Sequence, residues 1–398
     1  MFIKNGDVFI NGTHFEKVLI RTNGSIISDI IETNTVKHTE DIDSEELIDA
    51  RNMYVIPGLI DTHIHGALGY DTADEIEDSL AEALNAMSSY LINNGVTAFV
   101  PTLVSVPESV IEQKAKEYIS YMASRKDISS NTLGAIGALP LGLNIEGPYI
   151  DASKRGSHNI DYLKSAGISF YKELIAKYPD VVKIVTVSPT KENLEFIEAL
   201  SRDINISIGH TACTYDEAML GFKKGANRVT HLYNAMNTLH HREPGLIGAA
   251  SDAMQAYVEL ISDNLHVHPA VVRSTFKMIG EDRMLLISDA IRTMGIESGT
   301  FKFGGSDIIV KDGKTTLLDG VTLAGATTNL YEAFKIAIAD KVPLQYVIKA
   351  TTINPARSIQ VDNVMGSIET GKLANILILD RNFNIKYVII KGYVVKRA

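Results

Sequence analysis

The segment LIDTHIHG, residues 59–66, has the composition of a short buried strand that ends in two histidines. Side chains at positions i and i+2 of a β-strand point to the same face of the sheet. We therefore expect His63 and His65 side by side at the end of this strand. Two imidazoles held in this way are suited to a metal ion, and the rest of the chain decides whether their spacing is a coincidence.

The composition is that of a globular protein and excludes several classes of partner. Of the 398 residues, 45% are hydrophobic and 22% are charged, and the net charge of −10 argues against a nucleic-acid partner. No apolar run approaches the roughly 20 residues that cross a bilayer, and the first residues lack the apolar core of a signal peptide. Cys213 is the only cysteine, which fits a reducing compartment. We expect a cytoplasmic protein with no membrane partner.

Short β-branched runs alternate with helical patterns through the middle of the chain. Eight such runs occur, at residues 59–66, 97–103, 141–149, 182–189, 205–211, 228–234, 257–263 and 284–291. Eight strands that alternate with helices predict an α/β protein, a parallel (β/α)8 barrel of the TIM type. Residues 300–325 interrupt the alternation with turn-rich β segments, which predict a hairpin before a last helical region.

Capping patterns indicate where two of the helices begin. Thr214 and Glu217 have the spacing of a capping box, and Gly225 has the place of a helix stop. Ser105 and Glu108 have the same capping spacing after the second predicted strand.

Both ends of the chain have a period-two hydrophobic pattern with Asn-Gly turns, which is typical of antiparallel β-structure. The simplest arrangement joins residues 1–56 and 361–398 in one small β-sandwich domain. The barrel, at residues 57–360, is then inserted between its two parts.

Almost every predicted barrel strand ends in a group that binds metals or moves protons. The active sites of such barrels lie at the carboxyl ends of the strands. A single strand-end His is usually a structural residue and a single Asp usually a helix cap, but neither explanation accounts for so many on one rim. These residues are His63, His65, Glu146, His210, His231, Asp263, His266 and Asp289.

The chemistry of this set predicts a metal-dependent amide hydrolase. Imidazole and carboxylate ligands without a thiolate suit a catalytic Zn²⁺ or a similar ion that keeps a position for water. Such an ion lowers the pKa of the water toward neutrality. Asp289 is placed to take the proton of that water and to pass it to a leaving amine. His266 is placed to stabilise the oxyanion.

Long motifs, rather than single residues, give a family resemblance. They are PGLIDTHIHG, NIEGPYI, KRGSHN, IGHTACTYDEA, VTHLYNAM, REPGLIGAA, SDNLHVHP, ISDAIRTMG, LAGATTNL, TTINPARSIQ and GSIETGKLANILILD. Over nearly its whole length the chain resembles the amidohydrolase superfamily and, within it, the N-acetylglucosamine-6-phosphate deacetylases.

The resemblance implies a metal centre with one or two divalent ions per subunit. Glu146, His210 and His231 would hold the principal ion. His63 and His65 would hold a second ion and share Glu146 with the first. Zn²⁺ is the first choice, with Fe, Mn and Co as alternatives.

The resemblance also implies a substrate site and a homodimer. Asp289 would be the general base and acid, and His266 would touch the acetamide carbonyl and reach across a dimer interface. Arg242 would pair with the phosphate through its guanidinium fork. The complete set of implied substrate contacts is Ser157, Asn234, Ala235, Arg242, Asp263, Asn264, Leu265, His266, Leu323, Ala324, Gly325 and Ala326. His158, His240 and His241 receive no role.

The predicted reaction removes acetate from N-acetylglucosamine 6-phosphate. Two enzymatic alternatives stay open: deacetylation of N-acetylgalactosamine 6-phosphate, which differs at C4, and hydrolysis of another N-acyl or cyclic amide. The stretch from Asn234 to Arg242 has no use in the second of these. A non-catalytic scaffold is disfavoured, because such a protein is expected to have lost at least one of the metal-binding or acid–base residues.

Overall fold

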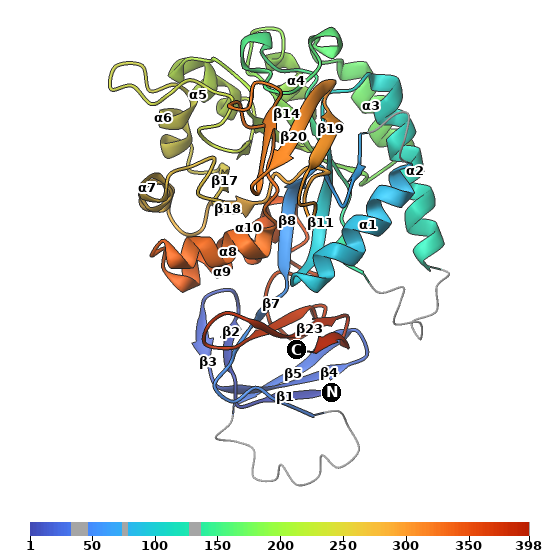
Figure 1. The fold of residues 1–398 in the computed structure, drawn as a ribbon, viewed down its shortest axis with the longest axis vertical. Coiled ribbons are helices and arrows are strands. Elements are labelled where there is room, and N and C mark those ends of the chain that lie inside the picture. The colour runs from blue at the N-terminus through green and yellow to red at the C-terminus, as the bar shows by residue number, and fades with distance from the viewer. Residues whose placement is uncertain (33–46, 74–78, 127–136, 398) are drawn as a thin grey trace.

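Eight parallel strands form a nearly closed barrel at the centre of the structure (Figure 1), a computed structural model that describes residues 1–32, 47–73, 79–126 and 137–397. The strands are β8 (Leu59–Ile64), β11 (Val96–Leu103), β13 (Leu143–Glu146), β14 (Val182–Val187), β15 (Asn205–Ile208), β16 (Arg228–Val229), β17 (Tyr257–Ile261) and β18 (Met284–Ile287). Each strand pairs in parallel with the next along the chain. A bridge between Ile64 and Ala290 brings the first and last strands together. The predicted (β/α)8 barrel is confirmed.

The strands are apolar because a parallel sheet covered by helices is buried on both faces. Every residue of β8 and β11 is buried. Short polar side chains inside the barrel pair between strands. The hydroxyl of Thr230, directly after β16, lies 2.6 Å from that of Ser207 on the neighbouring β15 and 2.9 Å from that of Thr186 on β14. These hydrogen bonds satisfy buried polar groups that would otherwise destabilise the fold.

Helices follow the strands and cover the outside of the barrel (Figure 1). They are α1 (Leu80–Asn93), α2 (Glu108–Lys126), α3 (Ile168–Lys177), α4 (Leu194–Leu200), α5 (Tyr215–Lys223), α6 (Gly245–Asp252), α7 (Pro269–Ile279), α8 (Leu330–Ala339), α9 (Leu344–Thr351) and α10 (Ile353–Ser358), with short 3-10 turns at Ala152–Lys154 and Ile160–Tyr162. The capping box of Thr214 and Glu217 is confirmed at the start of α5. The capping prediction for Ser105 is wrong, because α2 begins only at Glu108 and the Ser105 hydroxyl contacts His158 instead.

The two ends of the chain form sheets that share one apolar core below the barrel (Figure 1). One sheet has the order β5 (Ile26–Glu32), β4 (Val18–Asn23), β1 (Phe2–Lys4) and β6 (Leu47–Asp49). The other has the order β24 (Tyr393–Arg397), β23 (Ile385–Ile390), β22 (Ile376–Leu379), β7 (Tyr54–Pro57), β2 (Asp7–Ile10) and β3 (His14–Glu16). Three strands from the C-terminal end thus lie beside three from the N-terminal end, and the two groups meet where β22 pairs with β7. The domain boundaries at residues 56 and 360 stay a prediction.

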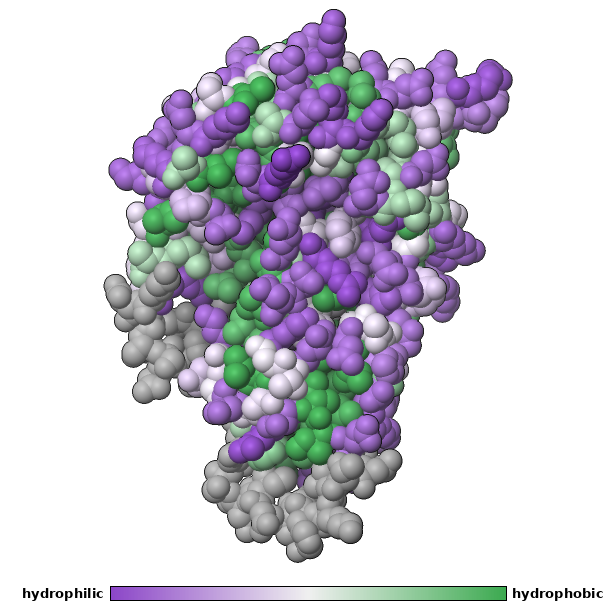
Figure 2. Space-filling view, turned by 180° about the vertical axis from the view of Figure 1, so that it is seen from behind, coloured by the Kyte–Doolittle hydropathy of each residue, from purple (hydrophilic) through white to green (hydrophobic). Residues whose placement is uncertain are grey.

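A small antiparallel sheet lies over the barrel at the predicted hairpin (Figure 1). Its strands are β19 (Gly299–Phe303), β20 (Ser306–Lys311) and β21 (Lys314–Leu317). Three short strands lie elsewhere: β9 (Gly66–Ala67) pairs with β10 (Tyr70–Asp71), and β12 (Leu139–Pro140) pairs with β11 of the barrel. Figure 2 shows that hydrophilic residues predominate on the face opposite to that of Figure 1, with apolar residues between them. Among the described helices none has the length and hydrophobicity that a bilayer-spanning segment requires.

Candidate metal centre

Five histidine rings converge on the carboxylate of Glu146, the last residue of β13. The Nε2 atoms of His231, His210 and His63 lie 2.9, 3.1 and 3.5 Å from Oε1, and those of His65 and His158 lie 3.3 and 3.4 Å from Oε2. We call these six residues the histidine cluster. All six are buried. The structure therefore brings together the five predicted metal ligands and adds His158.

Three strand-end residues of the site adopt left-handed backbone conformations. The φ angles are +47° for His210, +26° for His231 and +49° for Asp289. Residues other than glycine rarely adopt positive φ, and such strain is concentrated at functional sites. Here it turns the three side chains at the points where their strands end.

The tautomers of two rings fit a metal ion. The Nδ1 atom of His210 lies 2.8 Å from the Lys154 carbonyl oxygen, which only accepts, so Nδ1 carries the hydrogen. The Nδ1 atom of His63 faces the Glu259 carboxylate at 3.0 Å in the same way. In the neutral rings, Nε2 of His210 and Nε2 of His63 therefore carry no hydrogen, and each presents a lone pair. The Nε2 atoms of His210 and His231 lie only 3.0 Å apart, and those of His63 and His65 lie 3.3 Å apart. A cation fits this convergence of lone pairs and carboxylate oxygens.

His158 has the opposite tautomer and is not a ligand of this kind. The Ser105 backbone N–H donates to its Nδ1 at 3.2 Å, so Nδ1 is the acceptor and Nε2 carries the hydrogen. That hydrogen points toward Glu146 Oε2. Burial lowers the pKa of His158 to about 4, so its ring stays neutral. His158 therefore holds the second oxygen of Glu146, a role that the sequence prediction missed.

The metal-free cluster attracts positive charge. Burial raises the pKa of Glu146, but the charges of His63 and His210 outweigh it and hold that pKa well below its usual value. Burial lowers the pKa of His65, but hydrogen bonds to Asp289 and Glu146 prevail and raise it to about 9. For Asp289, burial raises the pKa and His63 lowers it, to about 2. The ionised carboxylates of Glu146 and Asp289 therefore favour a cation at this place.

Asp289 lies at the edge of the histidine cluster. Its Oδ1 is 3.4 Å from His63 Nε2 and 3.3 Å from His65 Nε2. The predicted pocket segment from Leu323 to Ala326 runs beside it, because the Ala326 N–H donates to the Asp289 carbonyl at 2.9 Å. Gly325 has a φ of +64°, and a Cβ there would approach Ile291 to 2.4 Å. Close packing therefore fixes this segment against Asp289.

His266 is held by Asp263 on the loop after β17. His266 Nδ1 lies 2.7 Å from Oδ2 of Asp263, and the backbone N–H groups of Leu265 and His266 donate to Oδ1. Both carboxylate oxygens are thus engaged by the loop itself, and Asp263 positions His266. Asn264 and Leu265 are exposed beside it.

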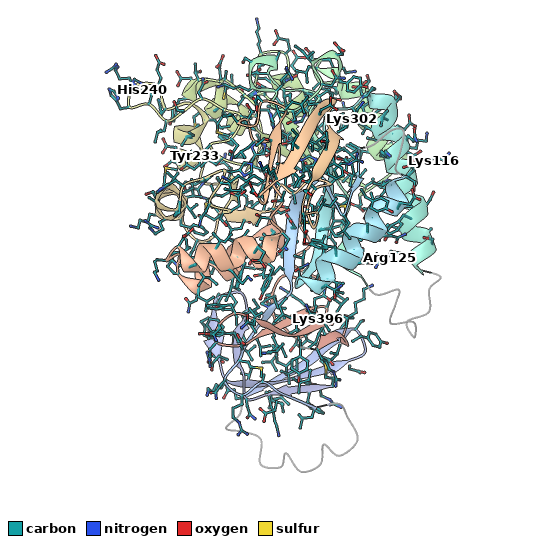
Figure 3. The ribbon with its side chains drawn as sticks, in the orientation of Figure 1. Lys116, Arg125, Tyr233, His240, Lys302 and Lys396 are labelled. Atoms are coloured by element: carbon teal, nitrogen blue, oxygen red, sulfur yellow. The ribbon has the colours of Figure 1, made fainter. Side chains whose placement is uncertain are left out.

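Other predicted substrate contacts lie on the far side of the barrel from the cavity described below. Asn234 and Ala235 are half-buried after β16, where the Thr211 N–H donates to the Ala235 carbonyl at 3.1 Å. Arg242 is exposed and its Nη1 lies 2.7 Å from His241 Nε2. Figure 3 places the neighbouring His240 at the outer edge of the molecule. Within the described residues, no hydrogen bond or ion pair given by the structure joins Arg242 to the cluster.

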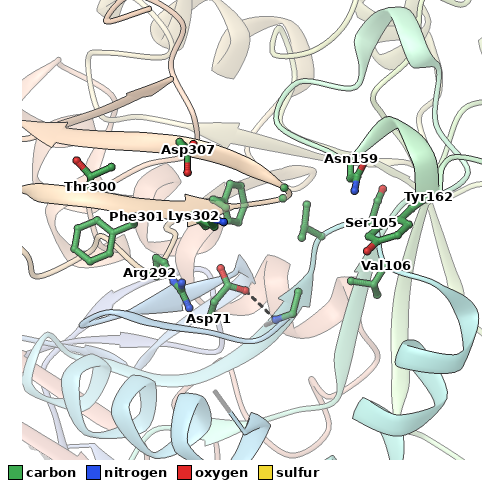
Figure 4. Close-up of a pocket in the computed structure, with 15 residues that line it drawn as sticks. Asp71, Ser105, Val106, Asn159, Tyr162, Arg292, Thr300, Phe301, Lys302 and Asp307 are labelled. Atoms are coloured by element: carbon green, nitrogen blue, oxygen red, sulfur yellow. Dashed lines mark hydrogen bonds between the residues drawn. The ribbon is translucent and has the colours of Figure 1, made fainter. Parts of the chain in front are cut away.

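A cavity of about 580 Å³ lies beside the cluster, between the β19–β20 hairpin and the segment after β11 (Figure 4). Phe303 lines it and contacts the His65 ring, with centroids 5.2 Å apart. Arg292 and Lys302 also line it, as does Ser105. Since β11 and β16 are four places apart in the eight-stranded barrel, this cavity and Asn234 lie on opposite sides of the rim. Ser157 lies near the cavity, because a Cβ on Gly304 would approach the Ser157 carbonyl to 2.4 Å.

A (β/α)8 barrel with histidine and carboxylate groups converging at the carboxyl ends of its strands defines a metal-dependent hydrolase of the amidohydrolase type. The chain belongs to the amidohydrolase family, whose sequence profile matches residues 54–395.

The relatives narrow the comparison to sugar-phosphate deacetylases. The chain is 32% identical to the N-acetylglucosamine-6-phosphate deacetylase of Vibrio furnissii over 92% of this chain and 89% of that one. It is 32% identical to the N-acetylgalactosamine-6-phosphate deacetylase of Escherichia coli O157:H7 over 84% and 86% of the two chains. The structure of N-acetylglucosamine-6-phosphate deacetylase from Pasteurella multocida superposes with a TM-score of 0.87 at 27% identity, covering 100% and 99% of the two chains.

We expect metal binding to release protons. Metal-bound imidazoles are deprotonated, whereas the pKa of His65 in the metal-free protein is raised to about 9. At pH 7.5 an incoming ion must therefore displace a proton, and the apparent affinity should rise with pH until about pH 9. Calorimetric titration of the metal-free protein with Zn²⁺, in buffers of different ionisation enthalpy, measures the protons released. A binding enthalpy that does not vary with the buffer would contradict the prediction.

Proposed function

We propose that the protein removes the acetyl group from N-acetylglucosamine 6-phosphate and yields glucosamine 6-phosphate and acetate. One observation carries the proposal: Glu146 lies between two histidine pairs, His210 with His231 and His63 with His65, beside the carboxylate of Asp289. This arrangement suits amide hydrolysis, and deacetylases of this substrate are among the relatives.

The metal ligands in this proposal are Glu146, His210 and His231 for the principal ion and His63 and His65 for a second ion. A bound divalent ion would supply a Lewis acid for the acetamide carbonyl and would lower the pKa of water. The nitrogen and oxygen donors favour Zn²⁺, with Fe, Mn and Co as the other candidates.

Asp289 acts as the general base and then as the general acid. Its carboxylate takes a proton from the attacking water, and the same proton is delivered to the amine nitrogen as the carbon–nitrogen bond breaks. His266 donates a hydrogen bond to the oxyanion from Nε2. Its Nδ1 faces Asp263, which holds the ring in place.

The sugar phosphate lies on the β16 side of the rim in this proposal. Asn234 and Ala235 contact the sugar, Arg242 pairs with the phosphate, and Ser157 and Leu323 to Ala326 line the pocket. We propose a cytoplasmic homodimer, which agrees with the exposed apolar side chains of Leu239 and Leu265 next to the exposed Arg242 and the half-buried His266.

Acetate release from a panel of N-acetylhexosamine phosphates, combined with metal analysis of the same protein, tests the proposal. Acetate should appear with N-acetylglucosamine 6-phosphate and should stop after the metal is removed. Equal activity with and without the metal would overturn it. N-acetylgalactosamine 6-phosphate is the second candidate substrate, because a deacetylase of that substrate is also 32% identical to this chain. A higher kcat/KM for that sugar would reassign the substrate without changing the reaction.

We expect Arg242→Ala to raise KM for the phosphorylated sugar by about 10–100-fold, because loss of a charge-assisted pair costs about 1.5–3 kcal/mol. Unphosphorylated N-acetylglucosamine should be affected far less. Lys302→Ala is the matched control, because Lys302 is an exposed cation that lines the cavity on the opposite side of the barrel. Steady-state kinetics with both sugars measure the difference. If Lys302→Ala has the larger effect on the phosphorylated sugar, the phosphate lies in that cavity instead.

A further inference from the structure

Glu259 connects the two halves of the histidine cluster from inside the barrel. It lies in the middle of β17 and is buried. Its Oε2 accepts from Nδ1 of His63 at 3.0 Å and from the backbone N–H of His231 at 3.3 Å. One carboxylate oxygen therefore fixes a residue from each of the two histidine pairs.

A buried arginine holds the other oxygen of Glu259. Nη2 of Arg228 lies 2.7 Å from Oε1 of Glu259 and 3.1 Å from Oγ1 of Thr62, and Nη1 donates to Ser358. Arg228 is fully buried. An arginine is always charged and only donates hydrogen bonds, so one oxygen of the Glu259 carboxylate faces Arg228 and the other is left for His63. The Glu259 side chain therefore cannot move away from His63 without breaking its buried ion pair with Arg228.

This arrangement determines the tautomer of His63. An ionised carboxylate only accepts hydrogen bonds, so Nδ1 of His63 must donate to it. In the neutral ring Nε2 then has no hydrogen, and it points at Glu146 Oε1 and at Asp289. His210 obtains the same tautomer from a backbone carbonyl, which no side-chain substitution removes. The tautomer of His63 thus depends on the side chain of Glu259, which a substitution can replace, whereas that of His210 does not depend on a side chain.

We propose that Glu259, held by Arg228, is a positioning residue that gives the pair of His63 and His65 its affinity for a second divalent ion. This inference rests on the proposed function only in treating the histidine cluster as a metal centre. The outer hydrogen-bond partner of a metal-bound histidine typically contributes about 10–100-fold to metal affinity. Glu259 touches only the backbone of His231, so the ion at His210 and His231 depends on it less.

Glu259→Gln is the decisive variant, because it keeps the shape of the side chain and removes the charge. If its amide oxygen faces Arg228, its NH₂ group donates toward His63, and the ring must then carry its hydrogen on Nε2. If its amide oxygen faces His63, the NH₂ group meets the guanidinium of Arg228, and two donors oppose each other. Both orientations disturb the pairing. His65→Asn, which removes a ligand of the same ion, is the matched comparison.

Zinc bound per chain is measured by elemental analysis over a series of buffered free Zn²⁺ concentrations. We expect two ions in the wild type. Glu259→Gln should bind its second ion about 10–100-fold more weakly and its first ion with less than threefold change. His65→Asn should also retain only the first ion. A wild type that binds one ion, a variant that binds both as the wild type does, or a folded variant that loses both equally would overturn the inference.

The zinc-loaded wild type provides a second measurement that does not depend on the variant folding. Nitrogen-15 NMR of the histidine rings should show His63 with hydrogen on Nδ1 and zinc on Nε2, and the reverse assignment would overturn the inference. Neither measurement uses activity, so the two proposals can fail separately. If Glu259→Gln weakens the second ion but the wild type releases no acetate, only the deacetylase function is refuted. If the wild type releases acetate and binds one ion, only the role of Glu259 is refuted.

Discussion

Replacing Asp289 by asparagine is expected to lower kcat for acetate release by about 10²–10⁴-fold, the usual contribution of a general acid–base group. The asparagine side chain keeps the size of Asp289 but can neither take the proton of water nor deliver it to the amine. The surrounding segment should not move, because the backbone of residue 289 carries the pairing with Ala326. Substrate binding and zinc content should therefore persist.

Stopped assays of acetate release, with zinc analysis of the same samples, measure the two effects separately. Asp307→Asn is the matched control, because Asp307 is an exposed carboxylate that lines the cavity by the hairpin and touches no histidine of the cluster among the described contacts. It should turn over like the wild type. An Asp289→Asn variant with wild-type kcat would remove Asp289 from the proton transfer.

Glu146→Gln is expected to have the largest effect on metal binding. The carboxylate lies between the His210 and His231 pair and the His63 and His65 pair. The glutamine amide has no negative charge, and its NH₂ group would face the Nε2 atoms of one of the two histidine pairs. Both ions should therefore be weakened, each by more than the roughly 10–100-fold that follows loss of an outer partner, and acetate release should fall with the zinc content.

Zinc binding at buffered concentrations measures this loss, and thermal unfolding reports whether the variant is folded. Glu108→Gln serves as the control, because it removes a carboxylate that accepts from Tyr149 and pairs with Lys164 outside the cluster. A folded Glu146→Gln variant that keeps both ions would show that another carboxylate bridges them.

Much of the fold could be predicted from the sequence because barrel strands and their chemistry have a regular spacing. Each of the eight predicted runs overlaps a barrel strand, and most of these strands end in a polar residue of the site. Glu146, His210 and His231 come together for this reason. The pairing of β7 with β22 joins distant ends of the chain, and both segments had a strand pattern.

The residues that were missed act through contacts that no local pattern encodes. His158 lies on a loop, and its role depends on Ser105, whose spacing to Glu108 resembled a capping box. Glu259 lies within a strand that otherwise looked apolar. A carboxylate inside a buried strand is rare unless it is paired. The presence of Glu259 in this apolar segment was therefore the signal in the sequence that it has a charged partner. Its partner Arg228 opens the preceding strand, so the pair becomes visible only when the strands are adjacent.

Anomalous diffraction from crystals grown with Zn²⁺ locates the ions relative to Glu146. We predict a zinc peak bonded to Glu146, His210 and His231 at about 2.0–2.2 Å, and a second peak bonded to His63, His65 and the same carboxylate. Active protein whose zinc peaks lie away from Glu146 would contradict it.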